Sequence, residues 1–248
     1  MTTLIRRPLP DERRLLVSPA WLALVDDHRR QPYDTGPLAA HLERWDQRVW
    51  VPETARAVRT ASGVVAYPGL GRRREPANAE PALYRVRLEA PGYRVLYTPD
   101  DQLDRFTADE TGREFLAYPY DDRTPPEVSA VPETIRLLPG VAYGYTPGTR
   151  VIAGVVRRPG SGVPVANVLV ASEGRTAEPD DAPWRERTLT DEAGAFRLAL
   201  RWAGTPVAGD PPAEEFTVTA TERPGRAGRL TLRLPDELGR VHVIEISE

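Results

Sequence analysis

His28 is the residue best placed to do chemistry, because two acidic residues, Asp26 and Asp27, directly precede it. A histidine beside a carboxylate can serve as a general base, and it can bind zinc where two or three further ligands join it. The three residues stand at the end of a predicted strand, where the chain enters a turn. Acidic side chains are common in turns because they hydrogen-bond the local backbone, so we favour a structural role and keep catalysis as the alternative.

The other residues that catalytic and cofactor sites need are missing or isolated. His41 and His242 are the remaining histidines, they fall in separate predicted elements, and cysteine is absent. No serine lies in a Gly-x-Ser-x-Gly motif, and the Gly-Ser-Gly at residues 160–162 is typical of a turn. Without lysine, the phosphate-binding loop that ends in Gly-Lys-Ser/Thr is excluded. We therefore predict no catalytic residue, no cofactor and no bound metal, and a protein that is not an enzyme.

Acidic pairs and aromatic residues are weaker candidates for binding. The pairs at residues 100–101, 121–122 and 180–181 could hold calcium, but they lack the spaced oxygen pattern of a calcium loop, so solvated turns are favoured. Core packing should account for most of the aromatic residues, leaving one or two for an exposed sugar or protein contact. The aromatic residues considered are Trp45, Trp50, Trp184, Trp202, Tyr67, Tyr84, Tyr93 and Tyr97.

The composition argues against several classes of partner. A net charge of −3 and a pI near 5.8 disfavour a dedicated nucleic-acid surface, and all 33 basic residues are arginine. The single arginine triple, Arg72–Arg74, stands beside Gly71 and Pro76, which predicts a solvated loop. No apolar run has the length of a secretory signal or a membrane-spanning helix. We expect a cytoplasmic protein that binds no nucleic acid and does not span a membrane.

The elements that would position these residues are predicted to be short strands. The chain has 26 prolines and 19 glycines spread along its length, which is the punctuation of turns between strands. Apolar and polar residues alternate through Tyr84–Leu88 and Phe216–Ala220, as in strands with one buried face. Such strands fit antiparallel sheets packed face to face.

The second half of the chain has the clearest series of such elements. A strand at Val151–Val156 is followed by the segment Gly162–Val170, which holds a Gly-x-Pro turn and an Ala-x-Val second strand, and then by a hairpin at Thr188–Leu198 and a strand at Phe216–Ala220. The order of a Gly-x-Pro turn, Ala-x-Val and Thr-x-x-x-Gly-x-Phe resembles the carboxypeptidase-regulatory-like, or transthyretin-like, domain. The resemblance covers residues 149–246. It implies a β-sandwich, and such domains are usually accessory modules.

A fainter copy of this series covers residues 20–97. Its elements are Trp21–Val25, Leu38–Leu42, Arg56–Tyr67, which matches Arg185–Leu198, and Tyr84–Tyr93, which matches Phe216–Gly225. We predict an all-β fold of two tandem small antiparallel β-sandwiches, transthyretin-like or Ig-like Greek keys, with an N-terminal arm. The predicted divisions are an arm at 1–18, a first sandwich with a proline-rich insert at 19–140, a linker at 141–148 and a second sandwich at 149–248.

The parts outside the repeated series give less definite predictions. The arm carries a few apolar residues at 15–17, and docking against the body or a partner stands beside disorder as an open alternative. The region from Tyr97 to Gly148 is predicted to hold short strands at Phe115–Tyr118 and Thr134–Leu138. The linker at the end of this region contains Tyr143, Tyr145 and Pro147, which predict a semi-rigid segment rather than a freely flexible one.

The enzymes that share the transthyretin-like architecture need residues that this chain lacks. Intradiol dioxygenases use a closely spaced histidine pair, and no His-x-His occurs here. The hydroxyisourate hydrolases end in Tyr-Arg-Gly-Ser, whereas this chain ends in the sequence of residues 243–248. The zinc carboxypeptidases use His-x-x-Glu, and Arg44 stands at that spacing from His41. The resemblance therefore implies a module without these activities.

Two functions from different classes remain. The first is a non-catalytic structural or protein-interaction subunit of a larger bacterial or phage-like assembly, such as a phage-tail-like or contractile injection particle. Its partners would be other protein subunits or further copies of itself, paired through edge strands or loops. The alternative is a β-sandwich that binds carbohydrate or another ligand through exposed aromatic residues, with Trp45 and Trp202 as the candidates.

Overall fold

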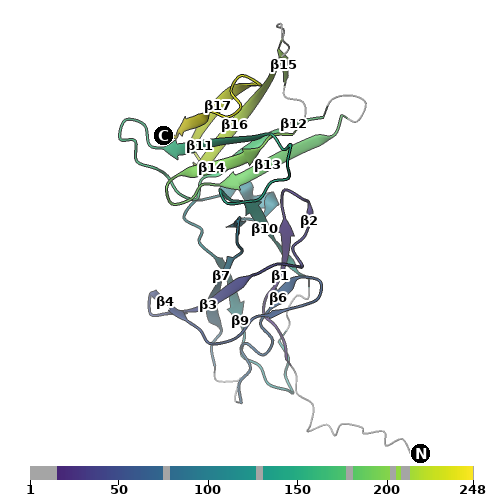
Figure 1. The fold of residues 1–248 in the computed structure, drawn as a ribbon. Helices are drawn as coiled ribbons and strands as arrows, with labels where there is room; N and C mark the ends of the chain where they lie inside the picture. Colours follow the sequence, from purple (N-terminus) through teal and green to yellow (C-terminus); the bar gives the residue numbers. More distant parts are fainter. Residues whose placement is uncertain are drawn as a thin grey trace, which may run out of the picture. The chain divides into compact units, whose positions relative to one another are not determined.

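Strands form nearly all of the regular structure (Figure 1). The computed structural model describes residues 16–74, 79–126, 131–176, 181–201, 205–207 and 213–247, with 205–207 described by their backbone alone. A 3₁₀ helix, η3 (Asp100–Arg105), is the one helical element named among the described strands. The predicted all-β fold class is confirmed. Within the described ranges, no helix is long and apolar enough to cross a membrane.

The chain divides into two compact units that each draw on several stretches of sequence. Unit 1 contains the described residues within Met1–Ala23, Ala40–Arg87 and Arg113–Glu133. Unit 2 contains those within Leu24–Ala39, Leu88–Gly112 and Thr134–Glu248. The domain limits at residues 18, 140 and 148 stay a prediction.

Unit 1 is built on a four-stranded sheet in the order β4-β3-β7-β9. Its strands are β3 (Ala39–Asp46), β4 (Val49–Pro52), β7 (Ala82–Glu89) and β9 (Arg113–Ala117). A second group pairs β6 (Val64–Ala66) with β5 (Val58–Arg59) and with the first half of β1 (Trp21–Asp26). The buried apolar residues of unit 1 come from both groups and include Leu22, Leu42, Val65, Tyr67, Tyr84, Val86, Ala117 and Tyr120.

Aromatic stacking connects the two groups of strands in unit 1. The Phe115 ring of β9 lies 6.0 Å from Tyr84 of β7 and 6.2 Å from Tyr67, which follows β6. The predicted alternation in β7 is confirmed, because Tyr84 and Val86 are buried while Arg85 is only half-buried. Aromatic rings of this size supply much of the apolar area that holds small sheets together.

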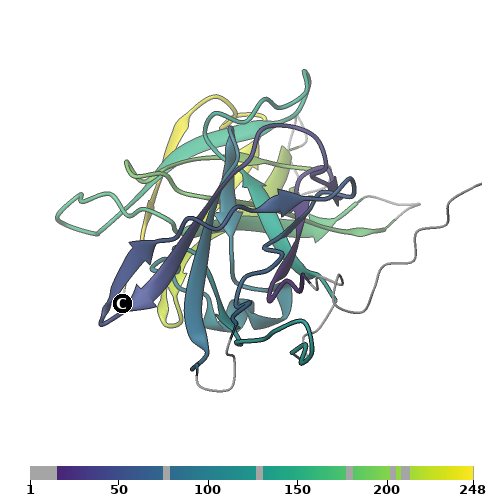
Figure 2. The same ribbon diagram turned by 90° about the horizontal axis from the view of Figure 1, so that it is seen from below.

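Unit 2 contains a β-sandwich (Figures 1 and 2). One sheet has the order β14-β11-β18, and the other has the order β13-β12-β16-β15 with β17 paired to β16. Their bounds are β11 (Val151–Arg157), β12 (Leu169–Arg175), β13 (Pro183–Leu189), β14 (Ala195–Ala199), β15 (Thr205–Val207), β16 (Ala213–Arg223), β17 (Arg226–Leu234) and β18 (Val241–Glu245). Strands β11 and β18 run parallel, so the prediction of purely antiparallel sheets is wrong for this pair.

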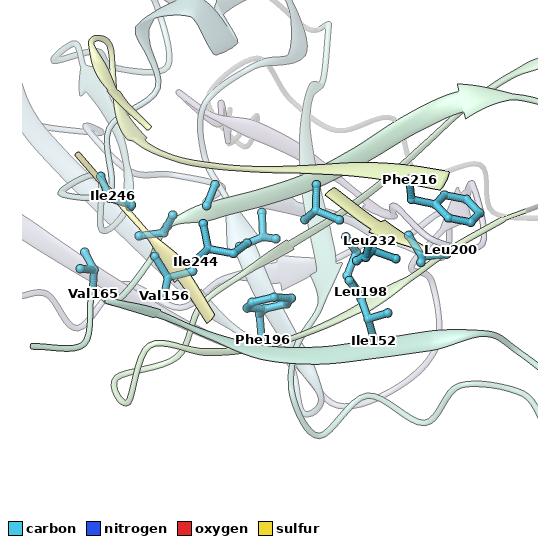
Figure 3. Close-up of a cluster of buried hydrophobic side chains, with 14 of the residues drawn as sticks. Ile152, Val156, Val165, Phe196, Leu198, Leu200, Phe216, Leu232, Ile244 and Ile246 are labelled. Carbon is cyan, nitrogen blue, oxygen red and sulfur yellow. The ribbon is translucent and has the colours of Figure 1, made fainter. Parts of the chain in front are cut away.

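The core of this sandwich contains side chains from both sheets (Figure 3). Ile152 and Phe196 lie on the three-stranded sheet, while Phe216 and Leu232 lie on the five-stranded one. The alternation predicted for Phe216–Ala220 is confirmed, since residues 216, 218 and 220 are buried. Each fully buried aliphatic or aromatic side chain contributes about 1.5–3 kcal/mol relative to its exposed state.

The second strand predicted from the Ala-x-Val motif at residues 166–168 begins only at Leu169. Pro164 forms an isolated bridge with Arg157, and Asn167 has φ +56° in a turn. Proline lacks the N–H that a strand interior uses, and asparagine tolerates the left-handed region, so this stretch turns before it extends. The Ala-x-Val motif therefore marks a turn followed by a strand.

The hairpin predicted at Thr188–Leu198 is a crossing between sheets. Strand β13 pairs with β12, whereas β14 pairs with β11. The connecting turn places Gly194 at φ +70°, where a Cβ atom would lie 2.5 Å from the carbonyl oxygen of Val156. In the fainter copy, β5 and β6 do pair as a hairpin. The two matched segments therefore have different pairings, because the motif specifies a turn and leaves the strand partner open.

Three further strands belong to unit 2. Strand β2 (Gln31–Pro32) pairs with the end of β1. Strand β8 (Tyr93–Leu96) pairs with β10 (Glu133–Pro139). The short strands predicted at Phe115–Tyr118 and Thr134–Leu138 are thus β9 and β10. Leu96 and Leu138 pack with Leu169 and Leu189, so β8 and β10 share a small core with the start of β12 and the end of β13.

The described end of the N-terminal arm is docked on unit 1. The Val17 amide donates to the Tyr120 hydroxyl at 2.9 Å, and the Val17 carbonyl accepts from Gly69 at 2.9 Å. Ser18 is buried and its hydroxyl accepts from the Tyr67 amide at 2.9 Å. Of the two alternatives for the arm, docking therefore applies to residues 17 and 18. Residues 1–15 lie outside the described ranges.

Candidate interaction surface

The β3–β4 hairpin of unit 1 presents its side chains on an edge of the sheet. Its register pairs Trp45 with Trp50, and β4 is the edge strand beyond β3. The two residues between the strands, Gln47 and Arg48, have φ values of +44° and +86°. Two-residue hairpin turns of type I′ have positive φ at both positions, and glycine, asparagine or aspartate usually occupies them. Non-glycine residues there carry backbone strain, and such strain often accompanies functional sites.

Exposed apolar side chains gather on this hairpin. Trp45 is 42% exposed, and Val49 and Val51 of β4 are exposed as well. The Trp45 and Trp50 rings meet edge to face at 5.0 Å. Trp45 and Trp50 lie on one face of the hairpin, and Val49 and Val51, whose cross-strand partners are Asp46 and Arg44, lie on the other. We call these four residues together the hairpin surface. Aromatic residues on an exposed surface are enriched in protein interfaces, where they supply large contact areas at low cost in conformational entropy.

A charged group on β7, the strand beyond β3, holds Trp50 in place. The Arg85 guanidinium lies 4.4 Å from the centroid of the Trp50 ring, which is cation–π geometry. Arg85 and Arg87 both donate to the Glu43 carboxylate, at 2.6 and 3.0 Å. Burial raises the pKa of Glu43, but the hydrogen bonds and charges of the two arginines outweigh it, so this pKa is lowered. The carboxylate therefore stays ionised and fixes Arg85 against the ring.

The acidic residues beside His28 belong to a buried ionic cluster in unit 2. Asp27 accepts two hydrogen bonds from Arg187, at 3.0 and 2.5 Å. Arg187 also donates to Asp100 at 2.6 Å. His28 Nδ1 lies 2.8 Å from the buried carboxylate of Glu186, which also accepts from Arg201. The prediction of local turn bonding is right only for Asp26, whose carboxylate accepts from the Arg29 amide at 2.9 Å.

Electrostatics favour the ionised forms of Arg187 and Asp100. Burial disfavours the charge on Arg187, but its hydrogen bonds to Asp27 and Asp100 and the charges of these two carboxylates outweigh that effect, so its pKa is raised. Burial likewise acts to raise the pKa of Asp100, and Arg187 with Arg136 and Arg185 reverses that effect, so the pKa is lowered. Carboxylates engaged in this way are poor general bases because each already accepts from a guanidinium. Among the described residues, no group of three or more His, Cys, Asp or Glu could hold a metal ion.

Tyrosines surround the neighbouring carboxylate of Asp26. The Tyr93 hydroxyl donates to Asp26 at 2.6 Å, and Tyr143 does so at 3.4 Å. Burial, followed by the bond to Asp26, raises the pKa of Tyr93 well above its usual range. Tyr143 meets Tyr145 edge to face at 4.8 Å, and Tyr145 donates to the Arg197 carbonyl. The tyrosines of the predicted linker are therefore packed within unit 2.

The remaining histidines lie in strands. His41 is exposed in β3 of unit 1, and the buried His242 of β18 lies 3.2 Å from the Glu237 carbonyl oxygen in unit 2.

The acidic pairs differ from one another. Asp100 is exposed at the start of η3, where it is also the partner of Arg187. Asp121 accepts from the Thr124 amide in a turn, as predicted, and Asp122 pairs with Arg72. Asp181 pairs with Arg175, while residue 180 lies outside the described ranges.

Four of the eight aromatic candidates are core residues. Tyr67, Tyr84, Tyr97 and Trp184 are buried, as expected for core packing, and Tyr93 is half-buried. Trp45 and Trp50 are the ones that form a surface. Trp202, predicted as a second candidate, lies outside the described ranges. Arg73 and Arg74 are exposed in a loop, as the arginine triple predicted. Sequence alone did not reveal that Arg85 and Glu43 support Trp50, because Arg85 lies more than 30 residues further along the chain than the other two.

No protein-family model matches the chain, and no curated protein matches it. Two solved structures are similar to it: a streptococcal ancillary pilin, with 9% identity and a TM-score of 0.29, and a Bacteroides ovatus protein described as an adhesin, with 9% identity and a TM-score of 0.20. The alignments cover 92% and 96% of this chain. They cover 61% of the pilin and 89% of the adhesin. Both TM-scores lie under 0.5, so these likenesses assign neither a family nor a role to this chain.

Proposed function

We propose that this chain is a non-catalytic structural or protein-interaction module and that it binds its partner through the hairpin surface of unit 1. The observation that carries this proposal is the exposed Trp45, on an edge hairpin, next to a Trp50 that Arg85 and Glu43 hold in place. A rigid aromatic anchor loses little conformational entropy on binding, so more of its contact energy appears as affinity.

The edge strand adds a second means of recognition. Strand β4 pairs with β3 on one side, and its Val49 and Val51 side chains are exposed. An edge strand with exposed β-branched residues can accept a strand from another chain, whose backbone supplies hydrogen bonds. The partner we propose is therefore a protein segment in extended conformation, either from a different subunit or from another copy of this chain.

The pairing of acidic groups in unit 2 supports a function without catalysis. The carboxylates of Asp27, Asp100 and Glu186 each accept from arginine. Catalytic acids and bases need a free position for the substrate proton. Paired groups of this kind hold a structure together instead.

The more specific predictions from the sequence, which concern the kind of assembly, the location and the family resemblance, belong to the same proposal. We place the module in a larger bacterial or phage-like assembly, such as a phage-tail-like or contractile injection particle, within the cytoplasm or an assembled particle. We also keep the resemblance of residues 149–246 to the carboxypeptidase-regulatory-like family. The support for the resemblance is the order of the sequence motifs, and the support for the assembly is that domains of this kind usually serve as accessory modules.

A carbohydrate-binding function is the alternative. The observation that favours it is the Trp45–Trp50 pair with the Arg85 and Glu43 polar groups beside it. Sugars stack on aromatic rings and hydrogen-bond to neighbouring charged side chains. Ligand-binding sites in general combine apolar surfaces with a few polar groups.

Site-specific photo-crosslinking in cells that make the protein tests the proposal. A photoreactive amino acid would replace Val49, which is 59% exposed on the hairpin surface, or Val163, which is 55% exposed in unit 2 and serves as the control. We expect discrete protein adducts from position 49, their loss when Trp45→Ala is added, and no such adducts from position 163.

Equal adducts from both positions, or adducts that survive Trp45→Ala, would contradict the proposal. A glycan array separates the alternative: sugar binding that Trp45→Ala abolishes, without protein adducts, would support the carbohydrate function. Analytical ultracentrifugation of the purified chain then distinguishes a self-association partner from a different subunit, because self-association depends on the concentration of this chain alone.

A further inference from the structure

Three arginines line an open hollow of about 470 Å³ in unit 2. Arg185 lies on β13, which is an edge strand of the five-stranded sheet. Arg30 follows β1, and Arg201 follows β14. The wall is completed by Pro183 and Trp184 of β13 and by Glu173 of β12. We call this site the arginine hollow, and it is separate from the residues of the hairpin surface.

Positive charge exceeds negative charge around the arginine hollow. The charged groups in it and in the ionic cluster beneath it are Arg29, Arg30, Arg136, Arg185, Arg187 and Arg201, with Asp26, Asp27, Asp100, Glu173 and Glu186. Six guanidinium groups meet five carboxylates, which leaves one positive charge in excess. An excess of one charge matches a ligand group that carries a single negative charge, and a carboxylate is such a group.

The three lining arginines keep hydrogen-bond donors that their protein partners do not use. Arg185 contacts Asp100 at 3.4 Å. Arg30 donates to the Arg185 carbonyl, and Arg201 donates to Glu186 and to the His28 carbonyl. Each guanidinium has five N–H donors in a planar fork that matches a carboxylate. Each of these side chains is also partly exposed, so the remaining donors are open to a ligand.

The crowding of like charges is consistent with an anion site. Burial lowers the pKa of Arg185, and repulsion from Arg187 and Arg30 lowers it further, against the attraction of Asp100 and Asp27. A bound anion would offset that repulsion. The hollow also has an apolar side, because Trp184 and Pro183 form part of its wall. Within the described residues, the buried indole N–H of Trp184 has no acceptor.

We propose that the arginine hollow binds the carboxylate group of a ligand, with Arg30, Arg185 and Arg201 as donors and the Trp184 and Pro183 wall against the ligand's carbon skeleton. The proposal does not rest on the function assigned to the hairpin surface. An acidic sugar and a small organic acid share this chemistry, and the experiment distinguishes them.

Isothermal titration calorimetry of the full chain tests the proposal with glucuronate, acetate and glucose, each against chloride at the same ionic strength. We expect heat from glucuronate and none from glucose. Binding of acetate with similar affinity would identify the carboxylate alone as the recognised group, whereas tighter binding of glucuronate would identify an acidic sugar.

Two variants locate the site. Arg185→Gln should weaken the binding about tenfold or more, since a hydrogen bond to a charged group is lost. Arg157→Gln is the control, because Arg157 is 42% exposed, as Arg30 is, and pairs with Glu245 outside the hollow. Circular dichroism checks that both variants fold. Arg30→Gln gives a second measurement if Arg185→Gln fails to fold. Equal affinity in the wild-type protein and the hollow variants, or an equal response to chloride or glucose, would overturn the proposal.

Discussion

Arg187 and Asp27 form a bidentate ion pair in which both side chains are only 1% exposed. The two residues are 160 positions apart, one on β13 and the other in the turn after β1. Removing two charges from water costs several kcal/mol each, and the pair recovers that cost only through close hydrogen bonds. The pair therefore requires the turn after β1 to meet β13 in one specific geometry.

Breaking this pair from one side should destabilise the protein strongly. Arg187→Met leaves the Asp27 carboxylate buried without its main partner, and we expect a loss of about 3–5 kcal/mol in the free energy of unfolding. The double variant Asp27→Leu with Arg187→Met removes both charges and should recover a large part of that loss. Urea unfolding of the wild-type protein, the two single variants Asp27→Leu and Arg187→Met, and the double variant gives the coupling energy between the two residues. A single-variant loss below about 1 kcal/mol, or no recovery in the double variant, would contradict a buried charge pair.

Acid should weaken the same region through Asp100. Its pKa in the folded protein is lowered below the ordinary value of 3.8, with Arg187 as the main stabilising partner. The unfolded chain therefore takes up the proton first, so the stability that Asp100 contributes is present above about pH 4 and is lost as pH falls through the folded pKa. Unfolding free energies between pH 6 and pH 3 measure this loss. Asp100→Asn should reduce the loss of unfolding free energy between pH 6 and pH 3. An unchanged loss would show that other carboxylates control the stability in acid.

The sequence predicts the strands well because alternation depends on neighbouring residues alone. Tyr84, Val86 and Phe216 are buried as the period of two requires. Strand pairing is harder to predict, because the turn at Gly194 is compatible both with a hairpin and with a crossing between sheets. The structure has the crossing, and the choice depends on which strands β13 and β14 meet far along the chain.

The site residues show the same limit. Asp27 and His28 look like a local turn cluster in the sequence, and their decisive partners, Arg187 and Glu186, lie more than 150 positions away. A charged residue in a strand pattern gives no sign of whether it faces water or another charge. Trp45 was a candidate from its type, but its exposure depends on the place of β3 and β4 at the sheet edge.

Two glycines with similar backbone angles should differ in their tolerance of alanine. Gly194 has φ +70° and Gly160 has φ +74°, so alanine at either position carries the strain of the left-handed region, about 1–2 kcal/mol. At Gly194 the new Cβ would also lie 2.5 Å from the Val156 carbonyl oxygen, whereas nothing lies within 4 Å at Gly160. We expect Gly194→Ala to cost clearly more than Gly160→Ala in thermal unfolding. Equal losses would mean that the turn at Gly194 relaxes without cost.

The hydroxyl of Tyr120 should control the docking of the arm. Tyr120 is buried, and its hydroxyl accepts from the Val17 amide at 2.9 Å. Tyr120→Phe keeps the ring in the core of unit 1 but leaves that amide without its acceptor, which costs about 1–3 kcal/mol for a buried group and less if water replaces the hydroxyl. Hydrogen exchange should show faster exchange at the Val17 amide in the variant, while amides in β11 of unit 2 keep their protection. Faster exchange throughout both units would instead show that the hydroxyl supports global stability, and unchanged exchange at Val17 would show that the bond does not hold the arm.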